Sequence, residues 1–141
     1  MFDILVINAL LVTVVVVIHF EALKWISDLL PRLPNKPRIK VLFGVFAAMA
    51  AHVVEVWAFA LGYYFLIGEG NYGYLQGNTD NTLMDCAYFS FTTYTSLGLG
   101  DIEPIGQIRY LAGLESLVGL VLIGWTASFI YIEMRRYWGN Q

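Results

Sequence analysis

Three long apolar stretches constrain this chain more than any other feature of its sequence. They cover residues 4–20, 41–67 and 110–132, and a helix of about 17 residues or more can cross a bilayer. Composition agrees, because 58% of the residues are hydrophobic and only 13% are charged, against roughly 25% charged in a typical soluble domain. The sequence therefore predicts an all-α membrane protein with three transmembrane helices.

The first apolar stretch has a secretory signal as its alternative interpretation. Signal peptides carry positive charge before the apolar core and small residues at a cleavage site after it. Here Asp3 precedes the stretch, and the sequence Glu-Ala-Leu-Lys-Trp follows it. We therefore expect a retained membrane helix over residues 1–22.

The basic residues predict how the helices are oriented. Five of the eight Lys and Arg lie between the first and second stretches, and two more follow the third. Cytoplasmic loops are enriched in Lys and Arg, so both regions are predicted to be cytoplasmic and the N-terminus to lie outside. We thus expect a multi-pass protein of the plasma (inner) membrane with a cytoplasmic C-terminus.

The basic linker, residues 23–40, carries a further expectation. Residues 23–30 are amphipathic and include Trp25, which predicts a short helix lying in the inner interface of the bilayer. Pro31, Pro34 and Pro37 follow it. Because proline interrupts helices, we expect these residues to separate the interfacial helix from the second span.

The segment between the second and third stretches predicts a loop that enters the membrane and returns. Residues 68–81 are polar and rich in Gly and Asn, and residues 82–95 predict a short helix whose start has Thr82 and Asp85 in a capping-box pattern. Irregular backbone follows, and it is tolerated inside a bilayer only where it is buried in protein or lines water. Glycines there let successive carbonyls aim the same way, and rings of carbonyls can replace the water shell of a cation.

The irregular run resembles the selectivity-filter signature of potassium channels, T-x-G-[YF]-G-D-x-x-P. It reads Thr95-Ser96-Leu97-Gly98-Leu99-Gly100-Asp101, with Pro104 three residues later. The order of segments is also similar to the two-helix pore module of the ion channel family, here preceded by an extra N-terminal helix. The resemblance implies a pore domain over residues 41–136, with an outer helix 41–67, turret 68–81, pore helix 82–95, filter 96–101 and inner helix 107–134, before a short cytoplasmic tail, 137–141.

The resemblance implies a homotetramer in the lipid bilayer that passes potassium ions down their electrochemical gradient. It implies no catalysis, no cofactor besides the permeant ions, no nucleic acid and no small-molecule substrate. Filter support would come from Thr92, Thr95 and Asp101. The ions would bind backbone carbonyls, and one hydroxyl, of Ser96, Leu97, Gly98, Leu99 and Gly100.

Two positions depart from the signature. The family usually has Thr where Ser96 stands, and Tyr or Phe where Leu99 stands. A Tyr can hydrogen-bond to the pore helix and Leu cannot, so a weakly selective monovalent cation channel is one alternative. A non-conducting structural or regulatory membrane subunit is another. A membrane enzyme is disfavoured, because two histidines and one cysteine offer few metal ligands.

Ionisable residues within the apolar stretches predict a polar site behind the filter. His52 and Glu55 share one helix face, and Glu115 is expected at a similar depth in the third stretch. Two interpretations stay open, a proton-sensitive brace that alters conduction and a structural polar network. Gly119 is either a gating hinge or a point of close helix packing. No transition-metal site is expected, since His19 and Glu21 do not share a helix face.

Overall fold

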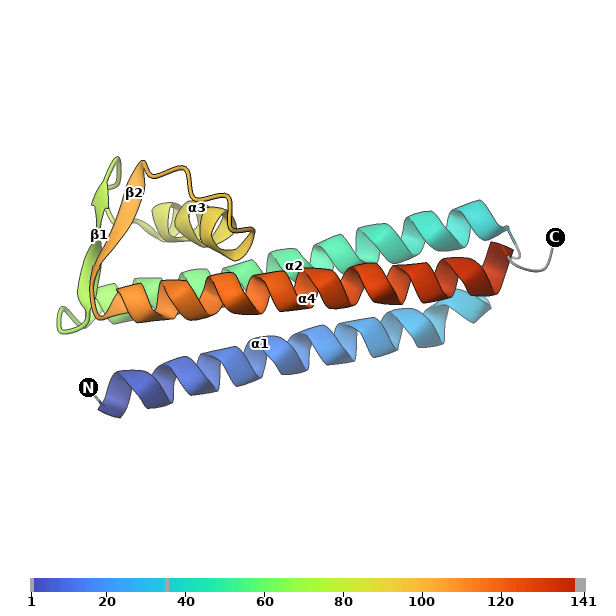
Figure 1. Cartoon of the computed structure of the whole chain (residues 1–141), viewed down its shortest axis with the longest axis horizontal. Coiled ribbons are helices and arrows are strands. Elements are labelled where there is room, and N and C mark those ends of the chain that lie inside the picture. The colour runs from blue at the N-terminus through green and yellow to red at the C-terminus, as the bar shows by residue number, and fades with distance from the viewer. Residues whose placement is uncertain (1, 35, 139–141) are drawn as a thin grey trace.

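Three long helices run side by side along the whole length of the molecule (Figure 1). The computed structural model describes residues 2–34 and 36–138. In chain order its elements are α1 (Phe2–Leu29), a 3₁₀ turn η1 (Leu30–Arg32), α2 (Pro37–Gly68), β1 (Gly73–Gly77), α3 (Leu83–Tyr94), β2 (Ile102–Gly106) and α4 (Ile108–Trp138). Each of the three long helices is apolar and long enough to cross a membrane, which confirms the predicted all-α membrane fold.

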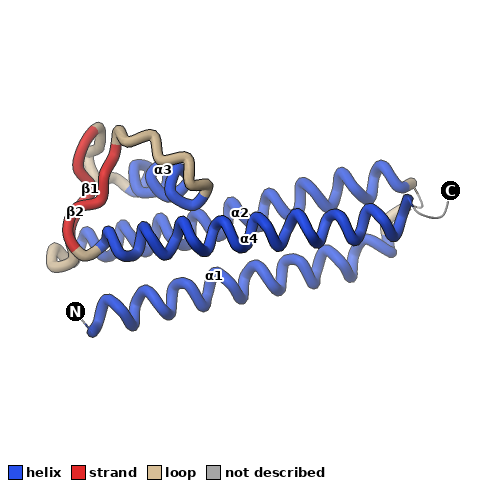
Figure 2. Tube along the Cα trace, viewed as in Figure 1, coloured by secondary structure: helices blue, strands red, loops and turns tan. Residues whose placement is uncertain are grey.

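The short elements gather at one end of the bundle. Figure 2 shows β1, β2 and α3 together at the end where the N-terminus lies, while the C-terminus lies at the opposite end. Helix α3 packs against α2 and α4, and α1 packs against the same two long helices. The re-entrant segment is therefore held between α2 and α4, as expected for a segment that leaves one span and returns to the next.

Two apolar clusters hold the helices together. The larger surrounds α3 and includes Phe59 and Tyr63 of α2, Tyr94 of α3 and Leu111 of α4. The smaller, near the C-terminal end of the bundle, joins Leu23, Ile26 and Leu30 to Ala48. Large apolar side chains elsewhere on the long helices are exposed, which suits surfaces that face lipid or another protein chain.

The smaller cluster overturns one expectation about the linker. The short interfacial helix predicted over residues 23–30 is not a separate element, because α1 continues to Leu29 and ends in the Pro-containing turn η1. Leu23 and Ile26 are buried in the cluster, so their apolar spacing serves packing against α2. The helix predicted to stop at residue 22 is longer for this reason.

The turret predicted over residues 68–81 is also more ordered than its composition indicates. Strand β1 lies within it and pairs antiparallel with β2, which follows the filter segment, in a register that sets Leu75 opposite Pro104. Leu75 is buried and anchors the pair. Gly73 and Gly106 have positive φ and lie too close to the opposite backbone for a side chain. The predicted tail falls largely on residues 139–141, outside the described residues.

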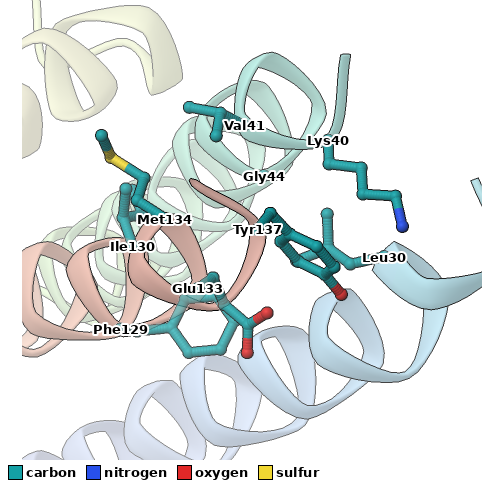
Figure 3. Close-up of a pocket in the computed structure, with 9 residues that line it drawn as sticks. All are labelled: Leu30, Lys40, Val41, Gly44, Phe129, Ile130, Glu133, Met134 and Tyr137. Carbon is teal, nitrogen blue, oxygen red and sulfur yellow. The ribbon is translucent and has the colours of Figure 1, made fainter. Parts of the chain in front are cut away.

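The C-terminal end of the bundle contains a small pocket between η1, the start of α2 and the end of α4 (Figure 3). The Lys40 ammonium lies 4.4 Å from the centroid of the Tyr137 ring. Glu133 is buried beside them, and its Oε2 has no hydrogen-bond partner in the described part of the chain. The pocket lies at the opposite end from α3 and is separate from the site described next.

Candidate functional site

Helix α3 begins at a capping box, as its sequence predicts. The Asp85 N–H donates to Thr82 Oγ1 over 3.2 Å, and the Thr82 N–H donates to Asp85 Oδ2 over 3.0 Å. These bonds satisfy two backbone donors that the first turn of a helix leaves free. The Thr82 backbone bond, followed by the bond from its hydroxyl, lowers the pKa of the Asp85 carboxyl.

Replacing Asp85 by Asn should therefore lower stability in a pH-dependent way. A carboxyl whose pKa is depressed on folding stabilises the fold above its ordinary pKa of about 4, and this contribution is lost as pH falls through the folded value. We expect a loss of about 0.5–1 kcal/mol at neutral pH. Thermal unfolding at about pH 7 and pH 3 should show a gap between the two proteins that shrinks in acid. An equal gap at both pH values contradicts this account.

The chain turns back on itself directly after α3. The Ser96 N–H donates to the Thr93 carbonyl over 2.9 Å, and the Gly98 N–H donates to the Thr92 carbonyl over 3.1 Å. Ser96, Gly98 and Gly100 have φ of 57°, 52° and 78°. Every second residue thus lies in the left-handed region, which glycine tolerates and serine occupies at a cost of about 1–2 kcal/mol.

The segment 96–100 faces an open hollow. Its lining includes Ser96, Gly98 and Gly100, together with Thr93 of α3 and Ser116 of α4. The side chains of Leu97 and Leu99 are 64% and 59% exposed. The glycine-rich backbone is therefore accessible in a single chain, and neither leucine is buried against α3.

Asp101 ties the end of this segment to its surroundings. The Tyr88 hydroxyl donates to Asp101 Oδ2 over 2.8 Å, and the Asn78 N–H donates to the Asp101 carbonyl over 2.9 Å. The bond to the carboxylate raises the pKa of Tyr88.

The hydroxyls of Thr92 and Thr95 donate to the carbonyls of Phe89 and Phe91 in α3. Thr92 contacts the segment after α3 through its backbone, because its carbonyl accepts from the Gly98 N–H.

A buried polar cluster lies behind α3. The Glu55 carboxylate lies 2.8 Å from His19 Nδ1 and 3.0 Å from His52 Nδ1, and it accepts a hydrogen bond from the Tyr94 hydroxyl. Thr126 Oγ1 lies 3.0 Å from His52 Nε2. The cluster links all four α-helices. Its contact to Tyr94 reaches the last residue before the irregular segment.

Glu115 belongs to a second cluster. Its carboxylate accepts hydrogen bonds from the Tyr63 hydroxyl, over 2.6 Å, and from the Ser90 hydroxyl. The expectation that Glu115 shares one polar site with His52 and Glu55, at a similar depth, is wrong for the described residues, because its hydrogen bonds go to these two hydroxyls. Depth along a helix was predictable, whereas the direction in which the side chain points depends on how the helices are rotated.

Gly119 lies where α4 passes the end of α3. A Cβ at this position would collide with the carbonyl oxygen of Tyr94 and approach its ring. One turn away on the same side, the Ser116 hydroxyl donates to the Thr93 carbonyl over 2.9 Å. These contacts support the close-packing interpretation of Gly119, because they show that α4 packs at this residue against the backbone just before residues 96–100.

Several residues of these clusters were missed by sequence reasoning. On its own helix, His19 has only Glu21 as a nearby ligand type, and its actual partner, Glu55, lies on α2. Tyr63, Ser90 and Thr126 carry hydroxyls that are common in membrane helices and that give no signal by themselves. A search for polar residues at matching depths on different helices would have found His19.

The fold and this geometry define a class of protein: a membrane protein in which a short helix and a glycine-rich return segment are held between two long helices. A family profile described as ion channel matches residues 42–136. The chain therefore belongs to the ion channel family, in its two-helix, potassium-channel-like form, with α1 as an additional apolar helix. No curated protein and no solved structure gives a match.

Proposed function

We propose that the chain forms a homotetrameric channel that conducts potassium ions through the backbone carbonyls of residues 96–100. The observation that carries this proposal is the alternation of φ in the segment, with left-handed values at Ser96, Gly98 and Gly100 and not at Leu97 or Leu99. Such alternation turns successive carbonyls toward one side of the chain. Carbonyl oxygens gathered on one side can replace the hydration shell of a cation.

The accessible surface of the single chain supports an oligomer. One segment can cover only one side of an ion, so several copies are needed to surround it. The hollow beside residues 96–100 and the exposed Leu97 and Leu99 are surfaces that neighbouring subunits would cover. When four copies surround a common axis with their hollows facing it, Asp101 is expected at one mouth of the pore.

The proposed channel lies in the plasma (inner) membrane with its N-terminus outside. The end of the bundle that holds α3 also holds the N-terminus, and the positive-inside rule puts the basic C-terminal end of α4 in the cytoplasm. The channel performs no covalent chemistry, needs no cofactor beyond its permeant ions, and takes neither nucleic acid nor a small-molecule substrate.

Flux measured in liposomes tests the proposal. Purified protein, first shown to be a tetramer by its mass in detergent, is reconstituted with a potassium gradient, and potassium efflux is followed. A matched preparation carries Gly98→Val, which puts a branched side chain at a left-handed φ of 52° where such residues are strongly disfavoured. We expect flux from the wild-type protein and none from the variant. Absence of wild-type flux would favour the non-conducting structural subunit.

Ion preference gives a separate prediction about Leu99. Its side chain is 59% exposed and offers no hydrogen bond to α3, so this part of the filter lacks the support that a Tyr supplies. We expect weaker preference for potassium over sodium, and Leu99→Tyr should raise it. Reversal potentials under bi-ionic potassium and sodium conditions measure the ratio, with Leu97→Tyr as the control. An unchanged ratio in the Leu99 variant contradicts this role.

A further inference from the structure

The buried cluster behind α3 brings together three side chains that ligate transition metals. They are His19 of α1 and His52 and Glu55 of α2, and one ligand atom from each lies within 4.8 Å of the other two. His19 and Glu55 are completely buried, and the His52 side chain is 19% exposed. Two imidazole nitrogens and one carboxylate oxygen are a ligand set that zinc accepts, with a fourth position left open.

The hydrogen-bonding pattern of the two rings can be completed in two ways, by an extra proton on one ring or by a metal cation. His19 Nε2 and His52 Nε2 lie 3.4 Å and 3.0 Å from the same Thr126 Oγ1. A hydroxyl has one proton and can donate to only one of them. If both rings instead donate from Nε2 to Thr126, both Nδ1 lone pairs face the Glu55 carboxylate. The proton available there is that of the Tyr94 hydroxyl, which contacts Glu55 and lies 2.9 Å from His52 Nδ1. In this second arrangement, a metal cation bound between the two Nδ1 atoms and the carboxylate would satisfy all three groups.

The charge of Glu55 points the same way. Its carboxylate is buried, and among the described residues its ion-pair partners are the two histidines alone. No Lys or Arg lies within ion-pair distance of it in the described ranges, 2–34 and 36–138. An ionised carboxylate inside a membrane protein needs positive charge nearby, which either a protonated histidine or a metal dication supplies.

We propose that His19, His52 and Glu55 bind a first-row transition-metal dication of the zinc type. Ligand atoms of a tetrahedral zinc, each roughly 2.0–2.1 Å from the metal, lie about 3.4 Å from one another. The three ligand atoms here lie within 4.8 Å of one another, so the side chains have to adjust their positions around the ion. Thr126 then accepts the Nε2–H groups and orients both rings, as outer partners of metal-bound histidines commonly do. This proposal departs from the sequence expectation of no transition metal, which did not consider that α1 and α2 bring His19 and His52 together.

The site would give α1 a role. A metal held by His19 joins α1 to α2, and through Glu55 it acts on the residue that ends α3, because the Tyr94 hydroxyl donates to the same carboxylate. Metal binding thus ties the additional helix to the support of residues 96–100. Binding itself does not depend on the proposed conduction, whereas any effect of the metal on flux does.

Metal binding to the full-length protein in detergent provides the test. Zinc titrated into chelator-treated protein should bind at one ion per chain, and cobalt should give the intense visible absorption of a four-coordinate site. We expect His19→Gln and His52→Gln each to weaken the affinity more than about 100-fold, since even outer-shell partners contribute about 10–100-fold. Glu21→Gln removes an exposed carboxylate on the same helix and should leave the affinity unchanged.

Two results would overturn the site. One is wild-type protein, folded by circular dichroism, that shows no saturable binding near one zinc per chain. The other is wild-type affinity in both histidine variants. Where a variant fails to fold, X-ray absorption of the zinc-loaded wild-type protein decides, because two imidazole ligands are required and an all-oxygen shell contradicts them. Liposome flux with and without zinc keeps the two proposals apart: binding without flux refutes conduction and leaves the site standing.

Discussion

Gly119→Ala is expected to destabilise the protein by about 1–3 kcal/mol, the usual cost of inserting a methyl group where no space exists. The new Cβ would meet the Tyr94 carbonyl oxygen, carbonyl carbon and ring. A backbone carbonyl cannot change rotamer to make room, as a flexible side chain can. Either α4 or the end of α3 therefore has to shift. Because residues 96–100 start from that end, we also expect potassium flux to fall.

The thermal unfolding midpoint in detergent measures this loss, and liposome flux measures its effect on conduction. Gly124→Ala is the matched control, since a Cβ there meets no atom within 4 Å and alanine favours a helix by up to about 1 kcal/mol. The same pair separates the two interpretations of Gly119. A hinge would lose flux while keeping the unfolding midpoint, and that result would contradict the packing role.

Glu55→Ala should have a larger effect, a loss of about 3 kcal/mol or more. The carboxylate is buried, accepts a hydrogen bond from Tyr94 and pairs with His19 and His52. Removing it leaves the buried His19 and Tyr94 and the partly buried His52 each short of a partner, and each unsatisfied buried group costs about 1–3 kcal/mol. Glu55→Gln keeps one acceptor oxygen at the same place and should lose less.

Unfolding of these variants is best compared with metal removed by a chelator, so that only hydrogen bonding differs between them. Glu21→Ala serves as the control because Glu21 is exposed and pairs weakly with Lys24 at 3.7 Å; its effect should stay within about 0.5 kcal/mol. A loss below about 1 kcal/mol in Glu55→Ala would show that water or rearranged neighbours replace the carboxylate.

The spans and the start of α3 were predictable because their signals are local. Apolar stretches report spanning helices directly, and the Thr82–Asp85 box is complete within four residues. The two strands gave no such signal. β1 is a Gly-rich sequence without apolar alternation, and its pairing with β2 depends on backbone approach at Gly73 and Gly106. Pairing partners so far apart in sequence are not visible in either strand alone.

The candidate site divides in the same way. The segment 96–101 could be recognised because its glycines and flanking helix lie in one continuous run. The cluster at Glu55 could be recognised only in part, because His19 lies 36 residues away on another helix. Residue spacing gives depth in the membrane, at about 1.5 Å per residue, but not the rotation of one helix against the next. The rotation of α4 about its axis directs Glu115 toward Tyr63 and not toward His52.

The pairing of β1 with β2 also has a mechanical consequence. Gly77 lies opposite Ile102 in the register, so the strands meet just outside the excursion that carries α3 and the filter segment. The strand pair thereby closes residues 78–101 into a loop. Closing a loop of this length costs about 3 kcal/mol of chain entropy, and the strand pairing helps to offset that cost. The two ends of the excursion are therefore joined to each other directly, and not only through the packing of α3 against α2 and α4.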